Sequence, residues 1–312
     1  MEYSEYKDNI ILEVLTGSHL YGTNTETSDN DYVGIFIPPK EYVLGLREVK
    51  EVFAGVSSKD DQRKNTKDAV DRKFYEFRNF VKLAMACNPN LIEILFADLD
   101  NIIFESLYGV NLLWENKKFL SKLCIPKFLG YAKAQKHKLF SKRDKLEDLK
   151  QGYDLLCKLS DKQVMVQVQE LPFYRKDESE HIRIGDLCFE PGVYVKKARQ
   201  NIKERLDKFT NRESIIEEFG YDTKYAMNLI RLLSEGLTIL EKGELEFPLP
   251  NANFLKEIRS GKYKIEKIIE FSEDLENQYE EAEKKTILPN TPDFKKIEEF
   301  VIETIEDFWN NK

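Results

Sequence analysis

A strand, a Gly-Ser turn and a spaced pair of aspartates constrain the fold of this chain more than any other feature. The apolar run NIILEVL is typical of a buried strand, and it is followed at once by Thr16, Gly17 and Ser18. A loop rich in Thr, Asn and Ser then leads to Asp29 and Asp31, which open a second apolar run, DYVGIFIPP. Two prolines stop that run, because proline cannot donate a hydrogen bond to a sheet ladder. The order predicts two strands joined by a polar loop, with both acids at the start of the second strand.

The spacing of the two acids gives them a chemical meaning. Side chains alternate along a strand, so Asp29 and Asp31 are expected on one face with Cα atoms roughly 6–7 Å apart. Two such carboxylates can share Mg²⁺, which prefers oxygen ligands and often bridges to substrate phosphates. Gly17 allows the backbone to approach a phosphate closely, and Ser18 can donate a hydrogen bond to it. An Asp-x-Asp pair alone is also typical of a structural turn, but its combination with the strand and the Gly-Ser turn favours a nucleoside triphosphate (NTP) site.

Charge and composition exclude several classes of protein. No run approaches the roughly 20 apolar residues of a membrane span, and the start MEYSEYKDN lacks the regions of a signal peptide, so we expect a cytoplasmic protein with no membrane partner. The 4 cysteines have no metal-binding spacing and predict neither a zinc site nor a disulfide framework. A net charge of −8 argues against coating of nucleic acid by bulk charge.

The hydrophobic pattern predicts an α+β protein of two domains. Residues 1–125 are expected to form a small α/β domain with a mixed sheet, including an amphipathic helix from about residue 74. Residues 126–312 are expected to form a mainly helical domain. Two runs rich in Lys and Arg, 127–150 and 196–208, are either solvated helix faces or a surface for substrate.

Several sequence blocks carry a family resemblance. The two-strand stretch resembles the signature of the DNA polymerase β nucleotidyltransferase superfamily. More narrowly, four successive blocks resemble the predicted nucleotidyltransferases associated with RNA-repair genes: GSHLYG…SDNDYVGIFIPP, DRKFYEFRNFVKLAMACNPNLIEILF, FGYDTKYAMNLIRLLSEGLTILEKGEL and KKTILPNTPDF. The resemblance implies that Asp29 and Asp31 are catalytic metal ligands and that Asp71 is the third carboxylate, with Asp68 as the alternative. It also implies that residues 1–125 are the nucleotidyltransferase catalytic domain and that residues 126–312 bind nucleotide and substrate. The implied cofactor is Mg²⁺, with Mn²⁺ as a substitute.

The helical domain supplies candidates for NTP binding besides Gly17 and Ser18. In the block GYDTKYAMNLIR, Lys224 and Arg231 are seven residues apart on one helix face, where both cations could reach a triphosphate. The resemblance adds Tyr221 and Asp222 to these candidates. The alternative is an amphipathic helix that keeps its charges in water.

Tyr21, in the Gly-Ser loop, is expected either to meet nucleotide or primer or to anchor the loop.

The resemblance implies transfer of a nucleoside monophosphate from an NTP to an acceptor hydroxyl, an activity of the EC 2.7.7 type. Association with RNA repair favours an RNA 3′ end, including that of a tRNA, as the acceptor. Two alternatives remain open: nucleotidylation of a protein or small molecule, for example AMPylation, and a catalytically silent nucleic-acid or protein-binding module. The Asp29 and Asp31 pair favours an enzyme, whereas the acidic net charge favours a non-polymeric acceptor.

Overall fold

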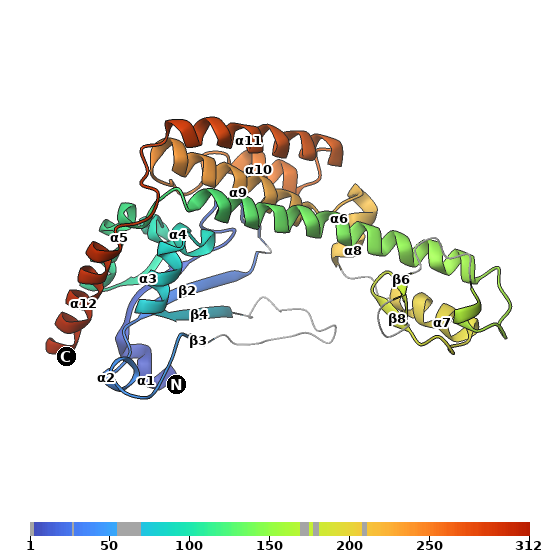
Figure 1. The fold of residues 1–312 in the computed structure, drawn as a ribbon, viewed down its shortest axis with the longest axis horizontal. Helices are drawn as coiled ribbons and strands as arrows, with labels where there is room; N and C mark the ends of the chain where they lie inside the picture. The colour runs from blue at the N-terminus through green and yellow to red at the C-terminus, as the bar shows by residue number, and fades with distance from the viewer. Residues whose placement is uncertain (1–2, 27, 55–69, 169–174, 177–180, 208–210) are drawn as a thin grey trace. The chain divides into compact units, whose positions relative to one another are not determined.

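The computed structural model describes residues 3–26, 28–54, 70–168, 175–176, 181–207 and 211–312 (Figure 1). The chain forms two compact units. Unit 1 comprises Met1–Ala132, Ile230–Glu257 and Phe271–Lys312, and unit 2 comprises Lys133–Leu229 and Ile258–Glu270. These units do not follow the predicted boundary at residue 125, because two helical segments from the second half of the chain belong to the unit that contains the N-terminal strands.

A mixed five-stranded sheet forms the centre of unit 1, in the order β3-β4-β2-β1-β5. The strands are β1 (Ile10–Leu15), β2 (Asn30–Phe36), β3 (Glu51–Phe53), β4 (Val70–Glu76) and β5 (Ile102–Glu105). β2 and β4 run parallel, and the other neighbouring strands are antiparallel. With its many helices, this sheet makes the protein α+β and confirms the predicted fold class.

Helices before and after the strands complete the N-terminal part of unit 1. They are α1 (Tyr3–Tyr6), α2 (Lys40–Val43), α3 (Phe77–Met85), α4 (Pro89–Leu95) and α5 (Leu107–Trp114), with short 3₁₀ turns at Lys7–Asn9, Leu99–Asn101 and Asn116–Phe119. α3 is the predicted amphipathic helix. It buries Phe77, Phe80, Val81 and Ala84 at helical spacing, and the Glu76 side chain caps its first turn by accepting from the Asn79 amide at 2.9 Å.

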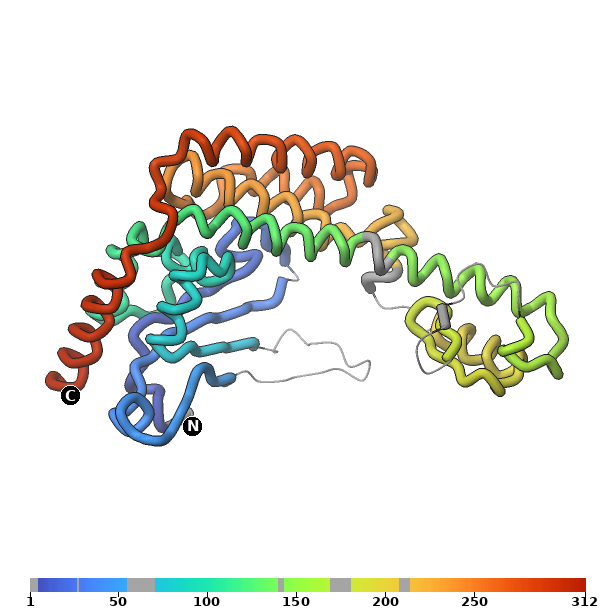
Figure 2. The backbone as a smooth tube through the Cα atoms, viewed as in Figure 1, coloured from blue at the N-terminus to red at the C-terminus, as the bar shows by residue number. Residues whose placement is uncertain are grey.

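Most of the C-terminal helices are longer, with the exception of α10 (Ala252–Arg259). The longer ones are α6 (Cys124–Leu156), α9 (Thr223–Lys242), α11 (Ile265–Lys285) and α12 (Phe294–Asn310). Within unit 1, α9 and α11 lie side by side (Figure 2), and the Tyr279 hydroxyl donates to the Leu233 carbonyl at 3.0 Å. Gly236 makes this approach possible, because a Cβ atom there would lie 2.1 Å from the Tyr279 hydroxyl oxygen.

Unit 2 has its own small sheet and core. The strands β6 (Arg175–Lys176), β7 (Ile182–Ile184) and β8 (Leu187–Phe189) are antiparallel, and α7 (Val195–Leu206) and α8 (Asn211–Phe219) follow them. Buried side chains from these elements and from the second half of α6 form one cluster that includes Leu149, Ile182, Phe189 and Ile202. Among the described helices of the whole chain, none has the length and apolarity that a membrane span requires.

Candidate active site

The parallel pairing of β2 and β4 brings two of the predicted carboxylates together. Asp31 on β2 is the register partner of Asp71 on β4. Register partners on adjacent strands point to the same face of a sheet, so both carboxylates lie on one face at the start of their strands. Both residues are exposed, as is Asp29, which lies in the loop one residue before β2. Asp68 lies outside the described residues.

The Gly-Ser turn is held against Asp31. The amide and the hydroxyl of Thr16 both donate to the Asp31 carbonyl, at 2.8 and 3.0 Å. Gly17 has a φ of +66°, and a Cβ atom there would lie 3.2 Å from Asp31 Oδ2. A glycine therefore suits this position, because its backbone is in the left-handed region and passes close to a carboxylate. Within the turn, the Thr23 amide donates to the Ser18 carbonyl at 2.8 Å.

The residues at this edge of the sheet fit a magnesium ion. Mg²⁺ retains several waters and is usually held by one or two carboxylates together with substrate phosphates, so Asp31 and Asp71 provide a sufficient protein contribution. The described part of the chain contains no group of three or more His, Cys, Asp or Glu side chains arranged to hold a metal ion by themselves. A metal here would thus complete its coordination with phosphate and water oxygens.

Lys224 is the exposed member of the predicted nucleotide-binding set. It lies in the first turn of α9, in unit 2. The Asp222 carboxylate caps this turn, because its Oδ1 accepts from the amides of Lys224 and Tyr225 at 3.0 and 3.3 Å. The buried Tyr221 donates its hydroxyl to the Tyr263 carbonyl at 2.6 Å. Tyr221 and Asp222 therefore fix the start of the helix, and their burial argues against direct contact with an NTP.

Arg231, two turns further along α9, is buried in unit 1 and only 5% exposed. Its Nη1 bonds to Glu93 and to both carboxylate oxygens of Glu235, the latter at 2.9 Å. Tyr21 completes this cluster, with its ring centroid 4.0 Å from the guanidinium and its hydroxyl donating to Glu93 Oε2 at 2.6 Å. We call Tyr21, Glu93, Arg231 and Glu235 the buried network. Its geometry argues against a triphosphate contact by Arg231 and favours the anchoring role for Tyr21.

Burial shifts the ionisation of the buried network. It raises the pKa of Glu235 well above the usual value for a carboxyl, against the opposing influence of Arg231. Burial also raises the pKa of the Tyr21 hydroxyl. For Arg231, burial disfavours the charge, but the carboxylates of Glu235 and Glu93 outweigh this effect and raise its pKa. The charge of Arg231 persists in the interior because it is paired with carboxyl groups.

Sequence reasoning missed Glu93 and Glu235. The spacing of Arg231 and Glu235, four residues apart on a helix, is a visible signal of an ion pair. Glu93 is 138 residues from Arg231 in the sequence, and no local pattern indicates that contact.

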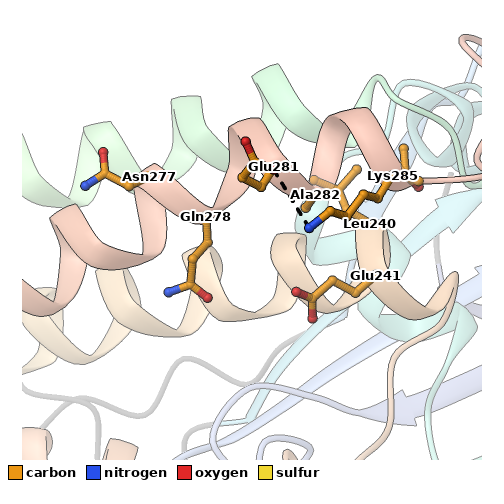
Figure 3. Close-up of a pocket in the computed structure, with 8 residues that line it drawn as sticks. Leu240, Glu241, Asn277, Gln278, Glu281, Ala282 and Lys285 are labelled. Atoms are coloured by element: carbon orange, nitrogen blue, oxygen red, sulfur yellow. Dashed lines mark ion pairs between the residues drawn. The ribbon is translucent and has the colours of Figure 1, made fainter.

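One hollow of unit 1 is separate from the carboxylates. It has a volume of about 490 Å³ and lies between α9 and α11 (Figure 3). Its lining residues are Leu240, Glu241, Asn277, Gln278, Glu281, Ala282, Lys285 and Thr286. None of these is a predicted site residue. The carboxylates instead lie at an open edge of the sheet.

Comparison with known proteins adds the family context. A family model described as "RNA repair pathway DNA polymerase beta family" matches residues 2–303. A protein of Enterobacteria phage T4 is described as "Uncharacterized 38.9 kDa protein in nrdC-mobD intergenic region", and this chain is 26% identical to it over an alignment of 295 residues. The match covers 85% of this chain and 87% of that protein. The crystal structure of a nucleotidyltransferase-like protein from Exiguobacterium sibiricum 255-15 matches with a TM-score of 0.26 and 10% identity, covering 91% of this chain and 72% of that one.

Proposed function

The chain belongs to the RNA repair pathway DNA polymerase beta family and is a nucleotidyltransferase, and on this premise we propose that it transfers a nucleoside monophosphate from an NTP to the 3′ hydroxyl of an RNA. The observation that carries the proposal is the register pairing of Asp31 and Asp71 beside Gly17. This pairing supports a site in which the exposed carboxylates of Asp31 and Asp71 and the backbone of Gly17 lie beside a bound triphosphate.

In this proposal Asp29, Asp31 and Asp71 hold Mg²⁺, or Mn²⁺ in its place. When bound, the metal would stabilise charge at the phosphates and would lower the pKa of the acceptor hydroxyl. The oxygen of the acceptor hydroxyl forms a bond to the α-phosphorus and gives up its proton to water. The bond from the α-phosphorus to the oxygen that bridges it to the β-phosphate breaks, and pyrophosphate leaves.

The remaining side chains orient the triphosphate. Because Gly17 has no Cβ atom beside the Asp31 carboxylate, a phosphate can approach its backbone closely at this point. Ser18 donates a hydrogen bond to a phosphate oxygen, and Lys224 supplies a positive charge. The protein thus contributes position and charge, which are the main protein contributions to phosphoryl-type transfer.

Two different acceptors compete with RNA. Transfer to a protein hydroxyl or to a small molecule would use the same carboxylates. The net charge of −8 favours a non-polymeric acceptor. The family name favours RNA. A catalytically silent module is set aside, since the chain is a nucleotidyltransferase by family.

The acceptor is identified by the molecule that becomes labelled from an α-labelled NTP. The protein is incubated with each α-labelled NTP and Mg²⁺ or Mn²⁺, together with RNA ending in a 3′ hydroxyl, the same RNA ending in a 3′ phosphate, or total protein. We expect label on the 3′-hydroxyl RNA alone. Label on protein, or equal label on both RNAs, would contradict the proposed acceptor. The variant Asp29→Asn with Asp31→Asn is the control for contaminating activity.

A further inference from the structure

The sheet face that carries the predicted carboxylates continues as a row of aromatic and basic side chains. Lys73 and Tyr75 follow Asp71 at two-residue intervals on β4, so all three point to one face. On the adjacent antiparallel strand β3, Phe53 is the register partner of Lys73 and Glu51 that of Tyr75. These neighbours share the face as well.

The side chains of this row contact one another. The Lys73 ammonium lies 5.2 Å from the centroid of the Phe53 ring and 4.5 Å from that of Tyr75, and it pairs with Glu51 at 2.9 Å. The Phe53 ring nevertheless remains 73% exposed. The row therefore presents an uncovered ring, a half-buried ring and a cation placed between them.

Fold stability alone is a weak explanation for this arrangement. Exposed cation–π contacts and exposed ion pairs each stabilise a fold only slightly. A single exposed apolar side chain would need no explanation. Here the exposed ring adjoins a cation and a second ring on the same face as Asp31 and Asp71, and this continuity indicates a shared role.

We propose that Phe53, Lys73 and Tyr75 form a stacking platform for the bases of a single-stranded polynucleotide whose 3′ end reaches Asp31 and Asp71. This inference rests on the proposed function for the identity of the acceptor. Bases of any sequence stack on exposed rings, and a neighbouring cation meets the phosphate backbone. Exposed aromatic residues on a sheet are also a recurrent way to hold single-stranded RNA. Strand geometry places Tyr75 about 13 Å from Asp71, so the platform engages the terminal nucleotides.

Glu51 is expected to oppose the binding of a polynucleotide at this platform. Its carboxylate pairs with Lys73, and it would repel a polynucleotide phosphate. Binding requires Lys73 to exchange Glu51 for phosphate, which costs little because both side chains are partly exposed. Removing the charge of Glu51 should therefore strengthen binding, whereas removing a ring should weaken it.

The test measures binding of a fluorescent single-stranded RNA, roughly ten nucleotides long, to the full chain by anisotropy. We expect Phe53→Ala to weaken binding about tenfold and Glu51→Gln to strengthen it roughly twofold to fivefold. Trp114→Ala is the matched control, since it removes another exposed ring (82% exposed) from α5 of the same unit. It should leave binding unchanged, and ATP binding measured by calorimetry should be unchanged in all three variants.

The outcomes separate this inference from the proposed function. Equal effects of Phe53→Ala and Trp114→Ala, or binding of duplex RNA as tight as that of the single strand, would overturn the platform. If the 3′-hydroxyl RNA is labelled but RNA binding does not depend on Phe53, the platform fails while the proposed function stands. If RNA binding depends on Phe53 but no RNA is labelled under any condition, the platform stands and the proposed reaction fails.

Discussion

Unit 1 contains two clusters of charge that differ in their relation to water. The predicted metal ligands Asp29, Asp31 and Asp71 are exposed at the sheet edge, whereas Arg231 and its carboxylate partners are buried. An exposed carboxylate keeps its hydration and can exchange water for a cation. A buried charge loses hydration free energy on the order of several kcal/mol, so it must be paired inside the protein. Burial therefore decides which charges remain available to a ligand.

The two clusters are nonetheless connected through one loop. Tyr21 of the buried network donates its amide to the Gly17 carbonyl at 3.0 Å. Gly17 in turn lies against the Asp31 carboxylate. The paired interior charges thus hold the turn beside which the exposed carboxylates are proposed to work.

Removing the exposed pair should have the largest effect. Asp29→Asn with Asp31→Asn should lower the rate of transfer on the order of 10⁴-fold or more, because groups that stabilise transition-state charge each contribute about 10²–10³-fold. Both residues are exposed, so the melting temperature should not fall. Initial rates with labelled ATP and thermal melts measure the two properties. Wild-type turnover by the folded variant would refute the metal-ligand prediction.

Arg231→Met should show the reverse pattern. It leaves Glu93 and Glu235 without their cation, so the free energy of unfolding should fall by about 3–5 kcal/mol. Urea denaturation measures this loss. Arg205→Met is the matched control, because Arg205 pairs with Asp186 in a more exposed setting and should cost less than about 1 kcal/mol. If the Arg231→Met protein is stable but binds ATP less tightly, the hypothesis that Arg231 contacts the triphosphate would be supported instead.

Asp71→Ala tests whether the register partner of Asp31 takes part in catalysis. We expect kcat to fall about 10²-fold with little change in ATP affinity, because the Asp29 and Asp31 pair still holds the metal that carries the triphosphate. Single-turnover rates and calorimetric titration measure the two quantities. Asp68→Ala should change neither. If Asp68→Ala rather than Asp71→Ala stops turnover, the third ligand is Asp68.

The smallest expected effect belongs to Lys224, which shares α9 with Arg231 but is exposed. Lys224→Ala should reduce ATP affinity about tenfold, since a charge-assisted hydrogen bond contributes about 1.5–3 kcal/mol. Stability should be unchanged, in contrast to Arg231→Met. Calorimetry that finds ATP affinity intact would identify Lys224 as a solvated side chain.

Local sequence patterns predicted the fold class, α3 and the first two strands. They could not predict that β4 lies beside β2 in the register that pairs Asp71 with Asp31, because that contact joins distant segments. The same limit applies to Arg231, whose helical spacing with Lys224 is correct but whose surroundings depend on α4. Periodicity identifies a helix face and does not say whether a second element covers it. The run VMVQV illustrates a further limit. Its alternation resembles a strand, yet Met165–Gln167 forms a 3₁₀ turn.

Unit 1 is assembled from three segments that are far apart in the sequence, and this affects how the protein folds during synthesis. α12 is tied to the N-terminal part of that unit, since the Trp309 indole donates to the Pro38 carbonyl at 3.2 Å and the Tyr108 hydroxyl donates to Asp307 at 2.9 Å. During synthesis the strands of the central sheet therefore emerge from the ribosome long before α12, which contacts the N-terminal part of the unit. Contacts between distant segments also slow folding, because the chain must first close large loops. During this interval the nascent sheet exposes apolar surface, and chaperone binding to the growing chain is the expected cellular response.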